Sequence, residues 1–367
     1  MPEPERDIQR IAVLRANAVG DFVFALPALA ALRAAYPHAE ITLLGAPWHA
    51  GFLRDRPGPI DRVVVVPPLP GIRDPAAGEA APSGSEEAPS TRAAFFTRAM
   101  AYRFDLAIQL HGGGRHSNPF VAGLGARLTC GLRSPDAPPL DRWVRYVYYQ
   151  PEVFRYLEVV ELVGAAPVTY RPALELTEQD RVEVKRLLGE ADRPRVVLHP
   201  GASDPRRRWP VERFSTVGDA LAQAGAQVLV TGVAAERDLV EGVVAGMRGP
   251  ARALVDEVSL GGLAALFSTC AVVVGNDSGP VHLAEAVGAG TVGLYWIGNF
   301  INGAPATRTR HRPMISWRLN CPECGRDCTR DLYPARPGEG CAHRLSFVDD
   351  IPAEEVREAA LELLSAG

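Results

Sequence analysis

Short apolar runs alternate with longer amphipathic stretches along most of the chain. In the first half we expect strands at 11–14, 40–45, 63–66 and 105–110. Helices are expected there at 22–35, 93–102 and 142–163. The second half predicts strands at 195–198, 227–231, 272–274 and 291–294. Its helices are expected at 211–224, 234–247, 260–267 and 281–287. Such alternation is typical of parallel sheets, so the pattern predicts an α/β fold with two doubly wound, Rossmann-like halves.

Two irregular stretches interrupt the alternation. Residues 67–92 are rich in proline, alanine and acidic side chains without periodicity, which indicates a flexible surface loop. Residues 167–177 read as the connection between the halves. We therefore expect an N-terminal Rossmann-like domain over 1–172, a C-terminal one over 173–348 and a C-terminal helix over 349–367.

Composition excludes some classes of protein. The 367 residues are 47% hydrophobic and 22% charged, which suits two ordinary cores. The net charge of −4 offers no basic surface for nucleic acid. No apolar run approaches the ~20 residues of a membrane helix, and residues 1–10 are polar, so we expect a cytoplasmic protein. Lys185 is the single lysine, which leaves phosphate recognition to arginine.

The segment 275–284 carries the clearest functional signal. It follows an apolar strand and leads into a helix, with Asp277, Ser278 and His282 placed around Gly275 and Gly279. A helix N-terminus presents unpaired backbone N–H groups and a positive dipole, so the turn is a candidate anion site. The alternatives are that Asp277 or Ser278 merely caps the helix, and that His282 is a packing residue.

Polar residues follow other predicted strands as well. Asp21 stands after Gly20 at a strand-to-helix turn, where an aspartate also commonly caps the helix. A later strand of the first half leads to His111, Arg115, His116 and Asn118, for which ordinary loop geometry is the alternative. In the second half the corresponding residues are Gly201, Arg206, Arg207, Arg208, Thr231, Gly232 and Glu236. Open α/β sheets bind ligands at this edge.

Four motifs resemble glycosyltransferase family nine, whose best-known members are the ADP-heptose lipopolysaccharide heptosyltransferases. The resemblance extends over residues 11–364. The motifs are Leu14-Arg15-Ala16-Asn17-Ala18-Val19-Gly20-Asp21 with its downstream helix, His199-Pro200-Gly201-Ala202 followed by Arg206-Arg207-Arg208-Trp209-Pro210, the turn 276–282, and the cysteine-rich tail.

The resemblance implies a GT-B architecture, with two facing Rossmann-like domains and a cleft between them. It implies an inverting, metal-independent transfer from a nucleotide-diphosphate sugar, with Asp21 as the catalytic base. Donor binding is then expected from Arg207, Arg208, Asp277, Ser278, Gly279, His282, Gly201, Thr231, Gly232 and Glu236. Acceptor binding is expected from Asn17, Gly20, His111, Arg115, His116 and Asn118. Arg207 stands where relatives usually carry lysine, and Asn17 where they often carry serine.

The implied donor is an ADP-linked heptose and the implied acceptor a lipopolysaccharide-core or related glycolipid. We therefore expect a monomer that visits the inner face of the cytoplasmic membrane, with the aromatic and basic stretch 143–156 as a candidate lipid contact. A different donor and acceptor, or a non-catalytic nucleotide-sugar-binding protein, stay open as alternatives. A nucleotide-sugar epimerase or dehydrogenase would need a dinucleotide glycine fingerprint, which residues 16–20 lack.

The six cysteines fall into two groups. Cys130 and Cys270 stand in apolar contexts and are expected to be buried. The others form Cys321-x2-Cys324-x3-Cys328-x12-Cys341, with His343 just beyond. Four of these five groups could hold a structural zinc ion, and free thiols or a disulfide are the alternatives. No cofactor is expected for the transfer itself.

Overall fold

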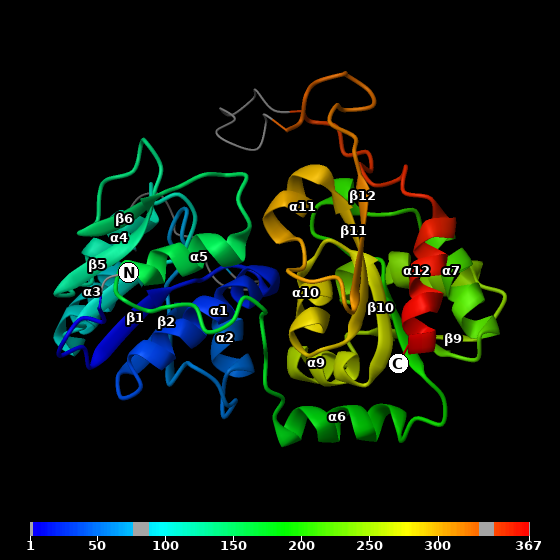
Figure 1. The fold of residues 1–367 in the computed structure, drawn as a ribbon, viewed down its shortest axis with the longest axis horizontal. Coiled ribbons are helices and arrows are strands. Elements are labelled where there is room, and N and C mark those ends of the chain that lie inside the picture. Colours follow the sequence, from blue (N-terminus) through cyan, green and yellow to red (C-terminus); the bar gives the residue numbers. More distant parts are fainter. Residues whose placement is uncertain (1–2, 76–87, 330–340, 367) are drawn as a thin grey trace. The chain divides into compact units, whose positions relative to one another are not determined.

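The chain forms two compact units, Met1–Glu175 and Leu176–Gly367 (Figure 1). The computed structural model describes residues 3–75, 88–329 and 341–366. Each unit is built on a six-stranded sheet in which every neighbouring pair of strands is parallel. The predicted α/β fold with two doubly wound sheets is therefore confirmed.

The first sheet has the order β3-β2-β1-β4-β5-β6. Its strands are β1 (Arg10–Leu14), β2 (Glu40–Gly45), β3 (Arg62–Val65), β4 (Leu106–Gln109), β5 (Leu128–Arg133) and β6 (Arg142–Arg145). The helices of this unit are α1 (Val19–Ala35), α2 (Pro47–Phe52), α3 (Ala88–Tyr102), α4 (Ser117–Ala122) and α5 (Glu152–Glu161). The central strands β1, β2 and β4 are buried along almost their whole length, which is why they are largely apolar in sequence.

The second sheet has the order β12-β11-β10-β7-β8-β9. Its strands are β7 (Arg195–His199), β8 (Gln227–Gly232), β9 (Ala251–Val255), β10 (Cys270–Asn276), β11 (Gly290–Trp296) and β12 (His311–Ser316). Its α-helices are α6 (Glu178–Leu188), α7 (Val211–Gln223), α8 (Arg237–Gly246), α9 (Leu260–Ser268), α10 (Gly279–Ala286), α11 (Ile297–Gly303) and α12 (Ala353–Ala366). Two 3₁₀ turns, η1 (Pro205–Arg207) and η2 (Ala234–Glu236), precede α7 and α8. The C-terminal α12, drawn in red, packs beside α7 (Figure 1).

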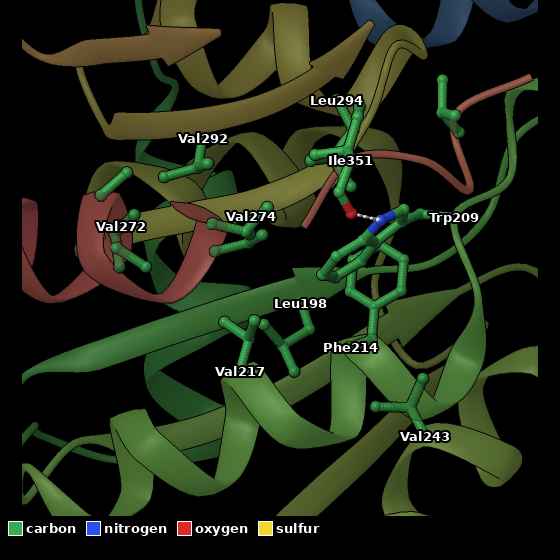
Figure 2. Close-up of a cluster of buried hydrophobic side chains, with 14 of the residues drawn as sticks. Leu198, Trp209, Phe214, Val217, Val243, Val272, Val274, Val292, Leu294 and Ile351 are labelled. Carbon is green, nitrogen blue, oxygen red and sulfur yellow. Dashed lines mark hydrogen bonds between the residues drawn. The ribbon is translucent and has the colours of Figure 1, made fainter. Parts of the chain in front are cut away.

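A large apolar cluster fills the space between the second sheet and its helices α7, α8 and α12 (Figure 2). Trp209 is 2% exposed and its ring meets Phe214 edge to face at 5.1 Å between centroids. Its indole N–H donates a 3.0 Å hydrogen bond to the backbone oxygen of Ile351. This bond satisfies a buried donor and ties the segment before α12 to the residues before α7.

Several boundaries differ from the sequence prediction. The first helix begins at Val19 rather than at residue 22, so Asp21 lies inside its first turn. The stretch 142–163 is not one helix, because residues 142–145 pair with β5 as an edge strand and only Glu152–Glu161 is helical. Alternate residues of β6 are exposed, the period-two pattern of a strand, which the apolar content of the stretch concealed.

The predicted loop over 67–92 is structured at both ends. Residues 69–73 form a tight turn closed by a β-bridge between Leu69 and Arg73, and α3 begins at Ala88. Residues 76–87 lie outside the described part of the chain. Among the residues that are described, none of the helices has the length and apolar character needed to span a bilayer.

Two valines of the second unit test how much its apolar cluster contributes to stability. Val243 on α8 is completely buried, whereas Val182 on α6 is 43% exposed. We expect Val243→Ala to lower the free energy of unfolding by about 2 kcal/mol, because it removes buried methyl groups and leaves a cavity. Val182→Ala should change it by less than about 0.5 kcal/mol. Urea denaturation followed by tryptophan fluorescence measures both, and equal losses would contradict this account of the core.

Candidate functional site

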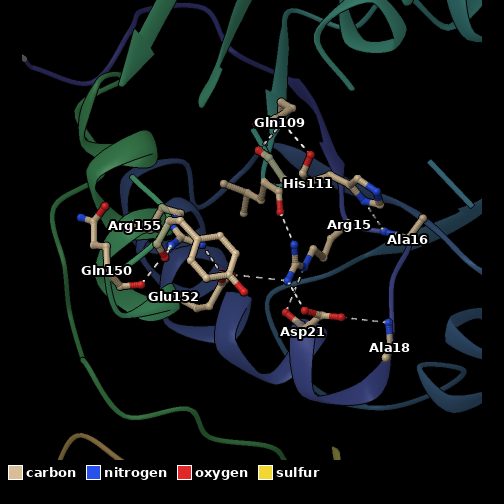
Figure 3. A network of polar contacts seen from close by, with 12 residues as sticks. Arg15, Ala16, Ala18, Asp21, Gln109, His111, Gln150, Glu152 and Arg155 are labelled. Atoms are coloured by element: carbon tan, nitrogen blue, oxygen red, sulfur yellow. Dashed lines mark hydrogen bonds and ion pairs between the residues drawn. The ribbon is translucent and has the colours of Figure 1, made fainter. Parts of the chain in front are cut away.

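The carboxylate of Asp21 is held at the start of α1 by two donors (Figure 3). Its Oδ1 accepts a 2.8 Å hydrogen bond from the Arg15 guanidinium, and its Oδ2 accepts one of 3.2 Å from the backbone N–H of Ala18. The second bond is half of a capping box, so Asp21 stabilises the helix start from the third helical position and not as the N-cap of a helix that begins at residue 22. The Asp21 side chain nevertheless remains 37% exposed, which leaves it accessible to a ligand.

Arg15 is the buried cation on which this arrangement depends, and the sequence did not single out its role. It follows β1 directly and its guanidinium donates to the backbone oxygens of Leu110 and Asp21 at 2.7 and 3.0 Å. The guanidinium also lies 4.8 Å from the centre of the Tyr156 ring and 3.6 Å from Glu152. Neutralisation by two carboxylates allows a full charge to stay in the interior.

Glu152, at the start of α5, links Arg15 to a second buried arginine, Arg155 (Figure 3). Burial raises the pKa of Glu152, while the charges of Arg15 and Arg155 oppose that rise. The network therefore connects α1, α5 and the end of β4 through charged hydrogen bonds in the interior of the first unit.

A cavity of about 610 Å³ opens beside Asp21. Its polar and aromatic lining consists of Asn17, Asp21, Trp48, Arg73, Asp74 and His111. The Trp48 indole N–H donates to the backbone oxygen of Asn17 at 3.1 Å, which fixes the ring at the cavity wall. The structure thus brings together Asp21, Asn17 and His111 from the predicted set and adds Trp48, whose helix α2 gave no periodic signal.

The other predicted acceptor residues do not line this cavity. Asn118 is buried and its side-chain amide donates to the backbone oxygens of Leu132 and Pro138. It therefore stabilises the loop between these two residues. Arg115 is exposed and lies 3.8 Å from Asp136. His116 stands at the N-cap of α4 and Gly20 is buried inside α1.

Two histidines of the first unit are buried. Burial lowers the pKa of both His49 and His111 to about 3, and the nearby charge of Arg15 acts in the same direction. His49 Nδ1 accepts a 2.9 Å hydrogen bond from the backbone N–H of Ala46, and its ring stacks on Trp48 at 3.6 Å. A neutral His49 therefore supports the ring that forms one wall of the cavity.

In the second unit, Asp277 connects the turn after β10 to α10, α11 and η1. It is 5% exposed, and its carboxylate accepts hydrogen bonds from Asn299 at 2.6 Å and from His282 Nε2 at 3.0 Å. Arg207 lies 3.5 Å away. Burial by itself raises the pKa of Asp277, but the His282 hydrogen bond and the Arg207 charge outweigh it, so this pKa lies below its ordinary value. Asp277 therefore orients His282 and Arg207.

Asn276, the residue before Asp277, connects the same turn to the segments that follow β7. Its side chain accepts from the backbone N–H of Trp209 at 3.0 Å and donates to the backbone oxygen of Pro200 at 2.8 Å. Ser278 then occupies the N-cap of α10, which begins at Gly279. The Ser278 hydroxyl is buried and has no hydrogen-bond partner among the described residues. This is the geometry of an anion site at a helix N-terminus.

The ends of β7 and β8 lie beside this turn and carry further predicted residues. His199 Nδ1 lies 3.0 Å from the Thr231 hydroxyl, and Nε2 lies 3.9 Å from Glu236. Burial lowers the pKa of His199. A Cβ on Gly201 would displace the Glu236 carboxylate, and a Cβ on Gly232 would collide with Val240 and crowd Glu236.

The three consecutive arginines have different roles. The Arg206 guanidinium pairs with Asp204, and Arg208 Nε donates to the backbone oxygen of Ala202 at 2.9 Å. Arg207 faces Asp277 and its side chain is 39% exposed. It is therefore the arginine of the three best placed to meet an anion held at the start of α10.

A cluster of four ligand atoms is formed by Cys321, Cys324, Cys341 and His343, all within 4.8 Å of one another. We call it the thiol–imidazole cluster. The Sγ atoms of Cys324 and Cys341 are 3.7 Å apart, and His343 Nδ1 lies 3.5 Å from the Sγ atoms of Cys321 and Cys341. None of the six cysteines, all of which lie in the described part of the chain, forms a disulfide. Of the five groups that the sequence offers, Cys328 lies outside this cluster, so the set of four cysteines is not the one that the fold brings together.

Comparison with known proteins identifies the family of the chain. The family model described as glycosyltransferase family 9 (heptosyltransferase) matches residues 92–324. Lipopolysaccharide heptosyltransferase 2 of Escherichia coli (strain K12) is 28% identical over 130 residues. That match spans 34% of this chain and 37% of the relative, little more than a third of its length.

Two solved structures resemble the whole chain. A family 9 glycosyl transferase from Veillonella parvula DSM 2008 has a TM-score of 0.78 at 23% identity and covers 100% of both chains. E. coli ADP-heptose lps heptosyltransferase II has a TM-score of 0.70 at 21% identity and covers 98% of this chain and 99% of that one. This similarity confirms the expected GT-B class of fold.

The buried His49 predicts acid sensitivity of the first unit. Its pKa is about 3 in the folded chain and about 6.5 in the unfolded chain, so the unfolded state gains protons as the pH falls below 6.5. Stability should therefore be lost on acidification, by about 1.4 kcal/mol from this residue between pH 7.5 and 5.5. His49→Asn keeps an acceptor for Ala46 but does not titrate, so it should reduce the difference in unfolding free energy by that amount.

His38→Asn supplies the control, because it makes the same replacement at an exposed position. Urea denaturation of the three chains at both pH values gives the comparison. A pH dependence that persists undiminished in His49→Asn would show that His49 is already charged in the native state.

Proposed function

Because the chain belongs to glycosyltransferase family 9, we propose that it transfers a sugar, heptose, from an ADP-linked donor to a glycolipid acceptor of the lipopolysaccharide-core kind. The observation that carries the proposal is the exposed Asp21 carboxylate, held by buried Arg15 at the wall of a cavity large enough for a sugar. The names of the similar proteins, which include ADP-heptose lps heptosyltransferase II, support the choice of donor.

In the proposed reaction, Asp21 accepts the proton of the acceptor hydroxyl as that oxygen attacks the anomeric carbon of the donor. The bond between the anomeric carbon and the diphosphate breaks, and the nucleoside diphosphate leaves with the electron pair. A single displacement inverts the configuration at the anomeric carbon. Arg15 keeps the Asp21 carboxylate in one orientation, which such a base requires.

The second unit holds the donor in this proposal. The diphosphate lies at the start of α10, where the backbone N–H of Gly279 and the hydroxyl of Ser278 donate to it. Arg207, oriented by Asp277, neutralises the charge that develops on the leaving group. Gly201, Thr231, Gly232, Glu236 and Arg208 line the remainder of the donor site. No metal ion takes part in the transfer.

The first unit binds the acceptor in the cavity, where Trp48 offers an aromatic face and Asn17 and His111 offer polar groups. Exposed apolar side chains at Trp143, Val147, Tyr149 and Phe154 support a contact with the membrane that carries the acceptor. The enzyme acts as a monomer at the inner face of the cytoplasmic membrane.

Two substitutions separate the roles of the units. Asp21→Asn should lower the rate of transfer by about 100-fold or more and leave nucleotide affinity unchanged, because it removes only the base. Arg207→Ala should weaken nucleotide binding by about tenfold, since it removes one charge-assisted contact with the diphosphate. Calorimetric titration with ADP, UDP, GDP and CDP, combined with a transfer assay, measures both.

Arg237→Ala is the matched control, because Arg237 is an exposed arginine of the second unit that pairs with Glu241 on the surface of α8. If the chain prefers another of these nucleotides, the donor sugar is linked to that nucleotide and not to ADP. Nucleotide binding without transfer in the unsubstituted chain would favour the non-catalytic alternative. Full activity in Asp21→Asn would refute the assignment of the base.

We further infer that the thiol–imidazole cluster holds one structural zinc ion. Zinc–sulfur and zinc–nitrogen bonds of about 2.3 and 2.0 Å place tetrahedral ligands about 3.8 Å apart for two sulfurs and about 3.5 Å for sulfur and nitrogen. The observed separations of 3.7 and 3.5 Å match these values. His343 Nε2 lies 3.0 Å from the Glu323 carboxylate, which would turn Nδ1 toward the metal.

Metal content distinguishes this ligand set from the four-cysteine set. We expect one zinc ion per purified chain, determined by mass spectrometry of the metal. Cys324→Ser and His343→Asn should lose it, whereas Cys328→Ala should retain it because that sulfur lies outside the cluster. Retention in His343→Asn together with loss in Cys328→Ala would establish the four-cysteine set instead. Iron in place of zinc would keep the site and change its metal.

A further inference from the structure

The thiol–imidazole cluster is connected to the basic stretch 204–210 by a short segment of chain. Only Arg344 and Leu345 separate His343 from Ser346, and Phe347 follows. The Ser346 hydroxyl donates to the backbone oxygen of Arg208 at 2.6 Å, and the backbone N–H of Phe347 donates to that of Arg206 at 2.7 Å. These two hydrogen bonds bracket Arg207 on both sides.

The bracketed residue is the one whose guanidinium faces Asp277. Arg207 is the last residue of the short turn η1. All three residues of this turn are only partly buried, so core packing does little to hold it in place. The Arg206 guanidinium adds a contact with the Phe347 ring at 5.9 Å. Besides the hydrogen bonds within 204–208 and the one from Trp209 to Asn276, the backbone around Arg207 is therefore held by Ser346 and Phe347.

Ser346 is also connected to the turn 321–325, which we call the cysteine turn. Arg318, three residues before Cys321, donates to the Ser346 backbone oxygen at 2.9 Å and pairs with Asp349 at 2.5 Å. Cys321 is buried in the same apolar cluster as Trp209 and Phe347. The cysteine turn is thus fixed to the core of the second unit, and a metal ion would fix Cys341 and His343 to that turn.

We propose that the metal bound by Cys321, Cys324, Cys341 and His343 positions Arg207 for the donor diphosphate, with Ser346 and Phe347 as the positioning residues between them. The role in donor binding rests on the function proposed above, whereas the mechanical connection does not. Loss of the metal releases Cys341 and His343, the segment through Phe347 loosens, and the carbonyls on either side of Arg207 lose their donors.

Hydrogen exchange of the full-length chain tests the connection without any substrate. The amides of Arg206, Arg207 and Arg208 donate within the stretch 204–208, so they report directly on its order. Removing the metal with a chelator should speed exchange of these amides by at least about tenfold, the effect of losing roughly one hydrogen bond, and added zinc should reverse it. Unchanged exchange in the metal-free chain, or a purified chain without metal, overturns the proposal.

Ser346→Ala separates the link from the metal. This variant should keep its zinc, show faster exchange over 204–208 and bind ADP several-fold to about tenfold more weakly. Ser365→Ala is the matched control, because its hydroxyl donates only locally to Glu362 on α12. Equal exchange in the two serine variants refutes the link. If exchange responds as expected but no nucleotide binds the unsubstituted chain, the donor assignment fails while the connection stands.

Discussion

Each parallel sheet brings the carboxyl ends of its strands to one edge, and the candidate sites depend on this constraint. In the first unit β1, β2 and β4 are neighbours, so Arg15, the turn before Trp48 and His111 meet although they are far apart in sequence. In the second, β10, β7 and β8 do the same for Asp277, His199 and Thr231. The polar side chains converge because the backbone hydrogen bonds fix the strand register.

Buried charges then determine which of the converging side chains can act. Arg15 is buried and donates its hydrogen bonds to Asp21 and to backbone oxygens. The Asp21 carboxylate stays accessible at the cavity. Asp277 is the inverse case, an enclosed carboxylate that leaves the cation Arg207 partly exposed. In both units a buried charged residue orients an exposed residue of opposite charge, because an unpaired buried charge would be strongly unfavourable.

The sequence predicted the site better at strand ends than within loops. Asp21 and the turn 276–279 lie where apolar runs stop, and they lie at the sites as observed. Asn118 carries the same signal, a polar residue after a strand, and its amide donates to the backbone oxygens of Leu132 and Pro138, which closes a loop. Trp48 was missed since α2 is only one and a half turns long and shows no helical period.

The sequence by itself determined the alternation of strands and helices, the glycines that certain turns require and the family to which its motifs belong. These are local properties, expressed over a few residues by hydrophobic period and backbone conformation. The tertiary structure alone decided the partners of Arg15 and Asp277 and the connection of Ser346 to Arg208. It also decided that His343, and not Cys328, belongs to the thiol–imidazole cluster. Those contacts join residues up to 138 positions apart, and no local pattern encodes a distance that only packing of the whole unit establishes.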